Sequence, residues 1–154
     1  MRTSTIERIT NETKVNLVLD LDGVGRGKIK TNIPFFDHML EQLSFHSSVD
    51  LELNARGDID IDFHHSVEDC GICLGKAFVE ALGDKKGINR YGFFLLPMDD
   101  ALIRVALDFS GRSFLKWKVN FPTKRIGNFD LELVREFFNA FSTNSGATLH
   151  VEML

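Results

Sequence analysis

The sequence predicts an α+β fold built from two halves of one design, with the order ββαββα in each half and the second half incomplete. Three observations lead to this prediction. Alternating apolar and polar residues mark short strands, and apolar residues three or four positions apart mark helices between them. The order of these segments in residues 1–86 then recurs in residues 87–154. We therefore interpret the chain as a single domain made of these two repeats.

The first half opens with two strands and a helix. Residues 13–21 alternate in part and are rich in valine and leucine, and residues 28–33 alternate cleanly. Three glycines between the two segments are expected to form a turn. Pro34 then introduces residues 35–43, whose apolar side chains have helical spacing. These residues are therefore expected to form a helix that covers one face of the strands.

A predicted hairpin and a second helix complete the first half. Residues 49–53 and 58–62 alternate strictly, so we expect two strands joined by a turn at 54–57. A long apolar pattern with helical spacing follows over 64–82. The glycine-flanked segment 83–87 is a typical end of a helix.

The second half repeats this pattern at two offsets. Residues 17–23 align with residues 88 positions later, and residues 38–53 align with residues 98 positions later. The difference of ten falls in residues 121–130, which resemble a surface loop, where insertions are tolerated. The repeat of the second helix would begin near position 162, beyond Leu154. The sequence therefore predicts a second half without its last strand and helix.

Composition excludes several classes of function. The formal net charge of −4 provides no basic field, so nucleic acid is not expected as a partner. No apolar run approaches the roughly 20 residues that a membrane helix needs, and the first residues do not resemble a signal peptide. The only cysteines, Cys70 and Cys73, form no disulfide framework, lie in an apolar helical segment and are interpreted as core residues. We expect a cytoplasmic protein.

Two adjacent histidines give the strongest chemical signal. His64 and His65 open the second predicted helix, and Glu68 follows one turn later on the same side. Imidazole and carboxylate together suit a divalent ion such as manganese, iron or zinc. Neighbouring helical side chains point about 100° apart, so the two rings favour two ions, or one ion and a substrate, over one shared ion. The alternative is a polar helix start whose carboxylate complements the helix dipole.

Two arginines next to glycines are candidate anion binders. Arg90 precedes Tyr91-Gly92, and Arg112 follows Ser110-Gly111. A guanidinium group beside backbone that can approach closely suits a phosphate or a carboxylate. The alternative is a solvated loop arginine in each case.

Taken together, these segments resemble the imidazoleglycerol-phosphate dehydratase family. The matching motifs are RITNET at 8–13, FFDHML at 35–40, GD at 57–58, HHSVED at 64–69, ALGDKKGI at 81–88, RYG at 90–92, PMD at 97–99, LDFSGR at 107–112 and TLH at 148–150. The resemblance implies the duplicated fold of ribosomal protein S5 domain 2. It also implies removal of water from imidazole glycerol phosphate to give imidazole acetol phosphate, in a homo-oligomer expected to be a 24-mer built from trimers.

The resemblance also implies roles for particular residues. Two Mn²⁺ ions are expected in each active site, at subunit contacts. The implied metal ligands are His38, His64, His65, Glu68 and Glu136, which occupies the repeat equivalent of His38. Arg90 and Arg112 are the implied phosphate-binding residues, Glu12 and Gln42 the implied substrate contacts, and Glu68 and Glu12 the implied catalytic carboxylates.

Two departures from the family pattern qualify this expectation. Phe63 stands where the family usually has aspartate, so a polar contact behind the histidines is expected to be missing. A second HHxxE helix and its trailing phosphate contacts would lie beyond Leu154, and we expect the natural enzyme to be longer. The alternative is a catalytically incomplete fragment that folds or assembles without binding metal firmly.

Overall fold

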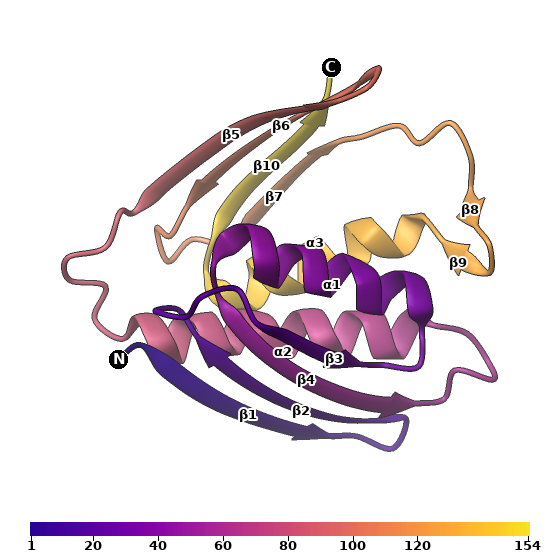
Figure 1. The fold of residues 1–154 in the computed structure, drawn as a ribbon, viewed down its shortest axis with the longest axis horizontal. Coiled ribbons are helices and arrows are strands. Elements are labelled where there is room, and N and C mark those ends of the chain that lie inside the picture. The colour runs from indigo at the N-terminus through magenta and orange to yellow at the C-terminus, as the bar shows by residue number, and fades with distance from the viewer.

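Two four-stranded sheets enclose a layer of helices in the computed structural model of residues 1–154 (Figure 1). The first sheet has the strand order β1-β2-β4-β3, and the second has the order β5-β6-β10-β7. The elements of the first half are β1 (Thr3–Ile9), β2 (Thr13–Asp20), β3 (Gly27–Lys30), α1 (Pro34–Ser47), β4 (Asp50–Gly57) and α2 (His64–Leu82). The helix predicted over 64–82 is therefore confirmed.

The second half contains counterparts of β1, β2, β3, α1 and β4, together with one insertion. Its elements are β5 (Tyr91–Met98), β6 (Ala101–Asp108), β7 (Phe114–Lys118), β8 (Arg125–Ile126), β9 (Phe129–Asp130), α3 (Glu132–Ser145) and β10 (Thr148–Met153). The short hairpin β8–β9 occupies the segment that the two offsets marked as an insertion. None of the three helices combines the length and the apolar character needed to cross a membrane.

The strand register confirms the duplication. β1 pairs antiparallel with β2 from Thr3 opposite Asp20, and β5 pairs with β6 from Tyr91 opposite Asp108, which is 88 positions later for both partners. The outer strands β3 and β7 pair in parallel with β4 and β10 in the corresponding registers. The two sheets therefore have the same topology, as well as the same order of elements.

The predicted hairpin in the first half is wrong. β4 continues through Gly57, because Ala55 takes the next inward position after Leu53 and is itself only 1% exposed. Residues 58–62 form a turn instead of a strand, with the Ile61 amide donating to the Asp58 carbonyl. The sequence pattern did not predict β1, which is mostly polar because Ser4 and Ile6 are its only buried residues. The order of the first half is therefore βββαβα.

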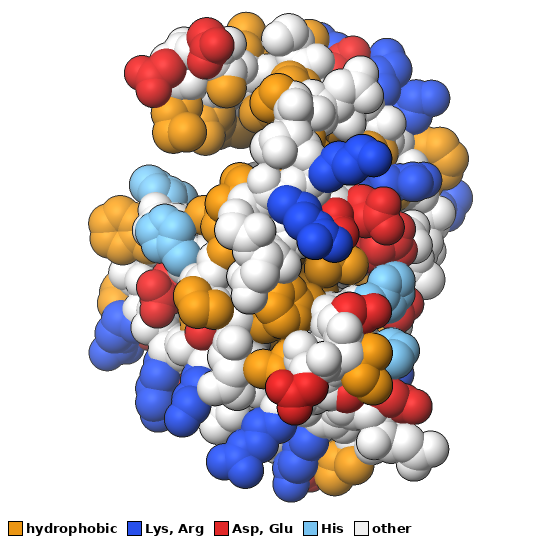
Figure 2. Space-filling view, turned by 90° about the vertical axis from the view of Figure 1, so that its right-hand side faces the viewer, with side chains coloured by type: hydrophobic (Ala, Val, Ile, Leu, Met, Phe, Trp, Pro, Cys, Tyr) orange, Lys and Arg blue, Asp and Glu red, His pale blue; other side chains and the backbone are white.

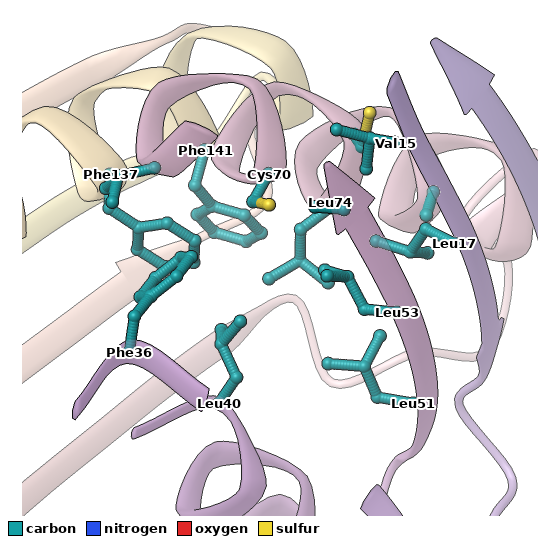
Figure 3. Close-up of a cluster of buried hydrophobic side chains, with 14 of the residues drawn as sticks. Val15, Leu17, Phe36, Leu40, Leu51, Leu53, Cys70, Leu74, Phe137 and Phe141 are labelled. Carbon is teal, nitrogen blue, oxygen red and sulfur yellow. The ribbon is translucent and has the colours of Figure 1, made fainter. Parts of the chain in front are cut away.

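Helix α2 lies at the centre of the core. Its buried face, which includes Leu74, meets Leu51 and Leu53 of β4, while Phe137 and Phe141 of α3 pack nearby (Figure 3). Both cysteines of α2 are buried and unpaired, which confirms their interpretation as core residues. This packing holds the first turn of α2, and the histidines on it, against the end of the first sheet.

The second sheet has an open face where the first sheet is covered. Ile6 is 8% exposed beneath α2, whereas its repeat equivalent, Phe94, is 65% exposed. Figure 1 shows no helix over β5 and β6 in the place that α2 takes on the first sheet. The predicted asymmetry between the halves is therefore present among residues 1–154.

Candidate metal and phosphate site

The start of α2 presents three chemically active side chains to solvent. The Asp62 carboxylate accepts a hydrogen bond of 2.8 Å from the His64 amide, so the turn before the helix directs both histidines outward. Phe63 points the other way and stacks on Phe129 with 6.3 Å between the ring centroids. An aromatic residue is tolerated here because it fills the core beneath the site.

His64 and Glu68 form a pair on one side of the helix. The His64 Nε2 atom lies 3.5 Å from Glu68 Oε2, and both side chains are nearly half exposed. The spacing of one helical turn predicted this pairing. An imidazole nitrogen and a carboxylate oxygen at this separation could share one divalent ion.

His65 has a different partner, Asp58. The Asp58 Oδ2 atom lies 2.9 Å from His65 Nδ1, and 19% of the Asp58 side chain is exposed. This hydrogen bond, with the charges of Glu12 and Asp62 acting in the same direction, raises the pKa of His65 above its usual value. Asp58 therefore gives His65 a polar contact of its own, separate from position 63.

The turn that carries Glu12 is fixed by a buried carboxylate on α2. Asp69 accepts a hydrogen bond of 2.9 Å from Arg8 Nε and another from the Thr13 hydroxyl. Thr10 Oγ1 in turn accepts from the Thr13 amide at 2.9 Å. These contacts join both strands that flank Glu12 to the helix that carries the histidines.

The metal ligands implied by the resemblance do not gather in one protomer. No group of three or more histidine, cysteine, aspartate or glutamate side chains could hold a metal ion. The two neighbouring rings, His64 and His65, are 6.0 Å apart and nearly perpendicular, as their divergent directions predicted. His38 is exposed on α1, and its repeat equivalent Glu136 is half-buried on α3. One chain therefore provides separate pairs and single donors.

The two candidate phosphate-binding arginines lie at the end of the second sheet. The Arg90 guanidinium donates two hydrogen bonds to the Asp108 carboxylate, of 2.6 Å from Nε and 3.1 Å from Nη2. These hydrogen bonds, together with the charges of Arg112 and Lys85, hold the pKa of the Asp108 carboxyl below its usual value. Arg112 is exposed, and its amide donates to the Ser110 hydroxyl at 3.0 Å. Three cations thus surround one carboxylate here.

Two further candidates lie apart from these clusters. Gln42 borders an otherwise apolar cavity of about 470 Å³ between α1, α3 and the β8–β9 hairpin. Glu136 borders a more polar cavity of about 700 Å³, together with Lys124 and Arg135.

Figure 2 shows histidines at two separate places on one face, with acidic side chains around one of them.

Comparison with known proteins decides the family. A family model described as imidazoleglycerol-phosphate dehydratase matches residues 31–154. The enzyme of that name from Cereibacter sphaeroides is 58% identical over all 154 residues, which cover 79% of its own length. The one from Paracoccus denitrificans is 57% identical over the same span. The chain belongs to the imidazoleglycerol-phosphate dehydratase family.

Solved structures support the same assignment. The imidazoleglycerol-phosphate dehydratase of Staphylococcus aureus is similar with a TM-score of 0.88 and 36% identity, over 99% of this chain and 84% of that one. The enzyme from Pyrococcus furiosus gives a TM-score of 0.83 and 34% identity, over 97% of this chain and 79% of that one. The predicted α+β fold with duplicated halves and the predicted family are thus confirmed.

The function follows from the family. The chain is an imidazoleglycerol-phosphate dehydratase, a hydro-lyase of histidine biosynthesis. It removes water from D-erythro-imidazole glycerol phosphate to give imidazole acetol phosphate. Sequence reasoning missed Asp58 and Asp69 as parts of the site, although each lies within a motif that carried the resemblance. Their hydrogen-bond partners become visible only when the strands and α2 are placed together.

Proposed function

We propose that this dehydratase depends on divalent metal, with manganese as the expected ion, and that the first turn of α2 supplies part of the coordination. The observation that carries the proposal is the pair His64–Glu68, beside a second histidine whose Nδ1 already has a partner. Imidazole nitrogen and carboxylate oxygen are the donor types that Mn²⁺ accepts. The donor chemistry fits, while the number of donors gathered in one protomer does not complete a site.

The remaining donors are proposed to come from other copies of the chain. Because His64, His65 and His38 are exposed, they remain accessible to a neighbouring subunit. A homo-oligomer, expected to be a 24-mer built from trimers, would bring donors of different subunits together. Glu136 is proposed as a further ligand, since it takes the position on α3 that His38 takes on α1.

The other polar residues are proposed to bind substrate and move protons. A divalent ion, when bound, makes the carbon-bound proton next to the substrate imidazole more acidic. Glu12 and Glu68 are proposed to exchange protons with the substrate, because both are carboxylates held close to the histidines. Arg90 and Arg112 are proposed to hold the phosphate, and Gln42 to contact the substrate. A cytoplasmic location remains part of the proposal, supported by the two unpaired thiols.

The experiment is metal analysis of the purified chain together with its sedimentation and its activity. We expect retained manganese and dehydration of imidazole glycerol phosphate, both lost in His64→Ala and Glu68→Gln. His46→Ala is the matched control, because His46 lies in the last turn of α1 and is expected to leave both unchanged. A chain that assembles but retains no manganese would instead favour the alternative of a catalytically incomplete fragment.

A further inference from the structure

The packing of β4 against α2 places one carboxylate behind His65. A Cβ atom on Gly57 would overlap the Ser66 hydroxyl and come within 3.3 Å of Thr13 Cγ2. The absence of a side chain therefore lets the end of β4 approach the first turn of α2. Asp58 is the next residue, so its carboxylate is delivered to the base of the His65 ring.

The Asp58 carboxylate makes a single hydrogen bond to the protein, and that bond is to His65. Its Oδ2 atom faces His65 Nδ1 at 2.9 Å, while its Oδ1 atom is buried without a partner. Burying a carboxylate oxygen without compensation costs free energy. The Asp58 carboxylate is thus kept at a position where its one hydrogen bond is to the His65 imidazole.

A carboxylate can only accept hydrogen bonds, so it dictates which nitrogen of a neutral imidazole carries the proton. The proton must reside on Nδ1 of His65, which leaves a lone pair on Nε2. The His65 side chain is about half exposed, so this lone pair is available to a ligand. The adjacent His64 has no such partner at Nδ1 and instead directs Nε2 toward Glu68.

We propose that Asp58 is a positioning residue, which orients His65 and fixes its tautomer so that Nε2 is the nitrogen that binds. Carboxylates placed behind ligating histidines have this role in metal sites generally. The inference extends the proposed function, because it assigns to this chain the atom through which His65 would contact a metal ion.

The experiment measures the tautomer of His65 by ¹⁵N NMR of the metal-free 154-residue chain, at a pH above the raised pKa of this histidine. The His65→Gln variant identifies the His65 signals. We expect the Nδ1–H form in the wild-type chain. In Asp58→Ala we expect a shift toward Nε2–H, the form that an unconstrained neutral imidazole favours. Either an Nε2–H form in the wild type or an unchanged tautomer in Asp58→Ala would overturn the proposal.

Two variants serve as controls. Asp62→Ala removes a nearby carboxylate that contacts the His64 amide, so the His65 tautomer should not change; a shift equal to that in Asp58→Ala would refute a specific role for Asp58. If the Asp58→Ala variant fails to fold, Asp58→Asn replaces it, because this substitution preserves the size of the side chain. Its amide can either accept from Nδ1 or donate to it, so the share of Nδ1–H should fall, and an undiminished share would count against the proposal.

A metal titration separates this inference from the proposed function. Mn²⁺ added to the wild-type chain should broaden the His65 ring signals, and the affinity should fall about 10–100-fold in Asp58→Ala. A wild-type chain with the Nδ1–H tautomer, lost in Asp58→Ala, but with no response to Mn²⁺ would count against the metal role alone. That result would still support Asp58 as the residue that positions His65.

Discussion

At the scale of single residues, local spacing predicted the donors but not the groups that hold them. His64, His65 and Glu68 lie within one helical turn, so their proximity could be predicted from periodicity alone. Asp69 binds Arg8, which is 61 residues away in the sequence. Such a pairing depends on the register of β1 and on where α2 crosses it. Periodicity carries no information about either.

Replacing Asp69 with alanine should destabilise the fold strongly. The carboxylate is buried and accepts from both Arg8 and Thr13, so its loss leaves two donors without their partner. Because Arg8 is about one-third exposed and can regain water, we expect a loss of about 2–3 kcal/mol in the free energy of unfolding. Urea denaturation measures this change.

The matched control for Asp69 is Glu7→Ala. Glu7 also pairs with a cation, Lys14, but both side chains are more than half exposed. Exposed pairs contribute little, so the control should stay within about 0.5 kcal/mol of the wild type. Equal effects of the two substitutions would contradict the structural role of Asp69.

At the scale of elements, helices were predicted better than strands. The α2 boundaries follow from a long apolar pattern and a glycine end, both of which are local signals. The strand predicted over 58–62 was wrong because the alternation there does not reflect burial: Ile61 is 78% exposed and lies in a turn. β1 was missed because an edge strand buries few side chains. Strand pairing depends on distant partners, which a local pattern does not specify.

The crossing of α2 and α3 predicts that Gly75→Ala will destabilise the fold. A Cβ atom there would lie 2.8 Å from the Phe141 carbonyl oxygen and 2.9 Å from Asn144 Cβ. Alanine gains about 1 kcal/mol in helix propensity, but separating the helices disturbs a packed core. We expect a net loss of about 1–3 kcal/mol, measured by thermal or urea unfolding.

Lys76→Ala tests whether helix propensity alone explains any change. Lys76 is the next residue on α2 and is exposed, so its replacement should alter the free energy of unfolding by no more than about 0.5 kcal/mol. A Gly75→Ala variant as stable as the wild type would show that the two helices are not in close contact.

The loop between β2 and β3 predicts a defined dependence of stability on acid. The amides of Arg26 and Val24 both donate to Asp50 Oδ1, and with the Arg26 side chain they lower the pKa of Asp50 to about 2. The unfolded chain has the ordinary aspartate value of about 3.9. Because the folded value is lower, the contribution to stability is complete above about pH 3.9 and is lost as the pH falls towards 2.

Asp50→Asn should therefore reduce the slope of the free energy of unfolding against pH within this acid window. Asp60→Asn is the charge-matched control, because no hydrogen bond to its exposed side chain ties it to another element. Urea unfolding at several pH values provides the measurement. An undiminished slope in Asp50→Asn would show that the loop amides do not stabilise the ionised carboxylate.

At the scale of the whole molecule, duplication explains both what is buried and what is not. Corresponding strands share one register, yet α2 covers only the first sheet. Val15 and Leu17 are fully buried there, while their equivalents Ile103 and Val105 remain partly exposed. The repeat, and the lack of a counterpart of α2 within residues 1–154, could be predicted from element order in the sequence. The extent of exposure of β5 and β6 could not, because it depends on which helices lie over each strand.

The open face of the second sheet should bind an environment-sensitive hydrophobic dye. Phe94 and Leu96 of β5 are 65% and 56% exposed on the face that a helix covers in the other half, and contiguous apolar surface of this kind attracts apolar ligands. We expect strong dye fluorescence with the folded 154-residue chain and markedly less with the double substitution Phe94→Ser and Leu96→Ser. Val18→Ser is the control, because Val18 is an exposed apolar residue on the outer face of the first sheet, with polar neighbours along its strand. Equal fluorescence in all three chains would show that the dye does not bind at Phe94 and Leu96. A drop only in the double variant would place the exposed apolar surface on the half that lacks a counterpart of α2.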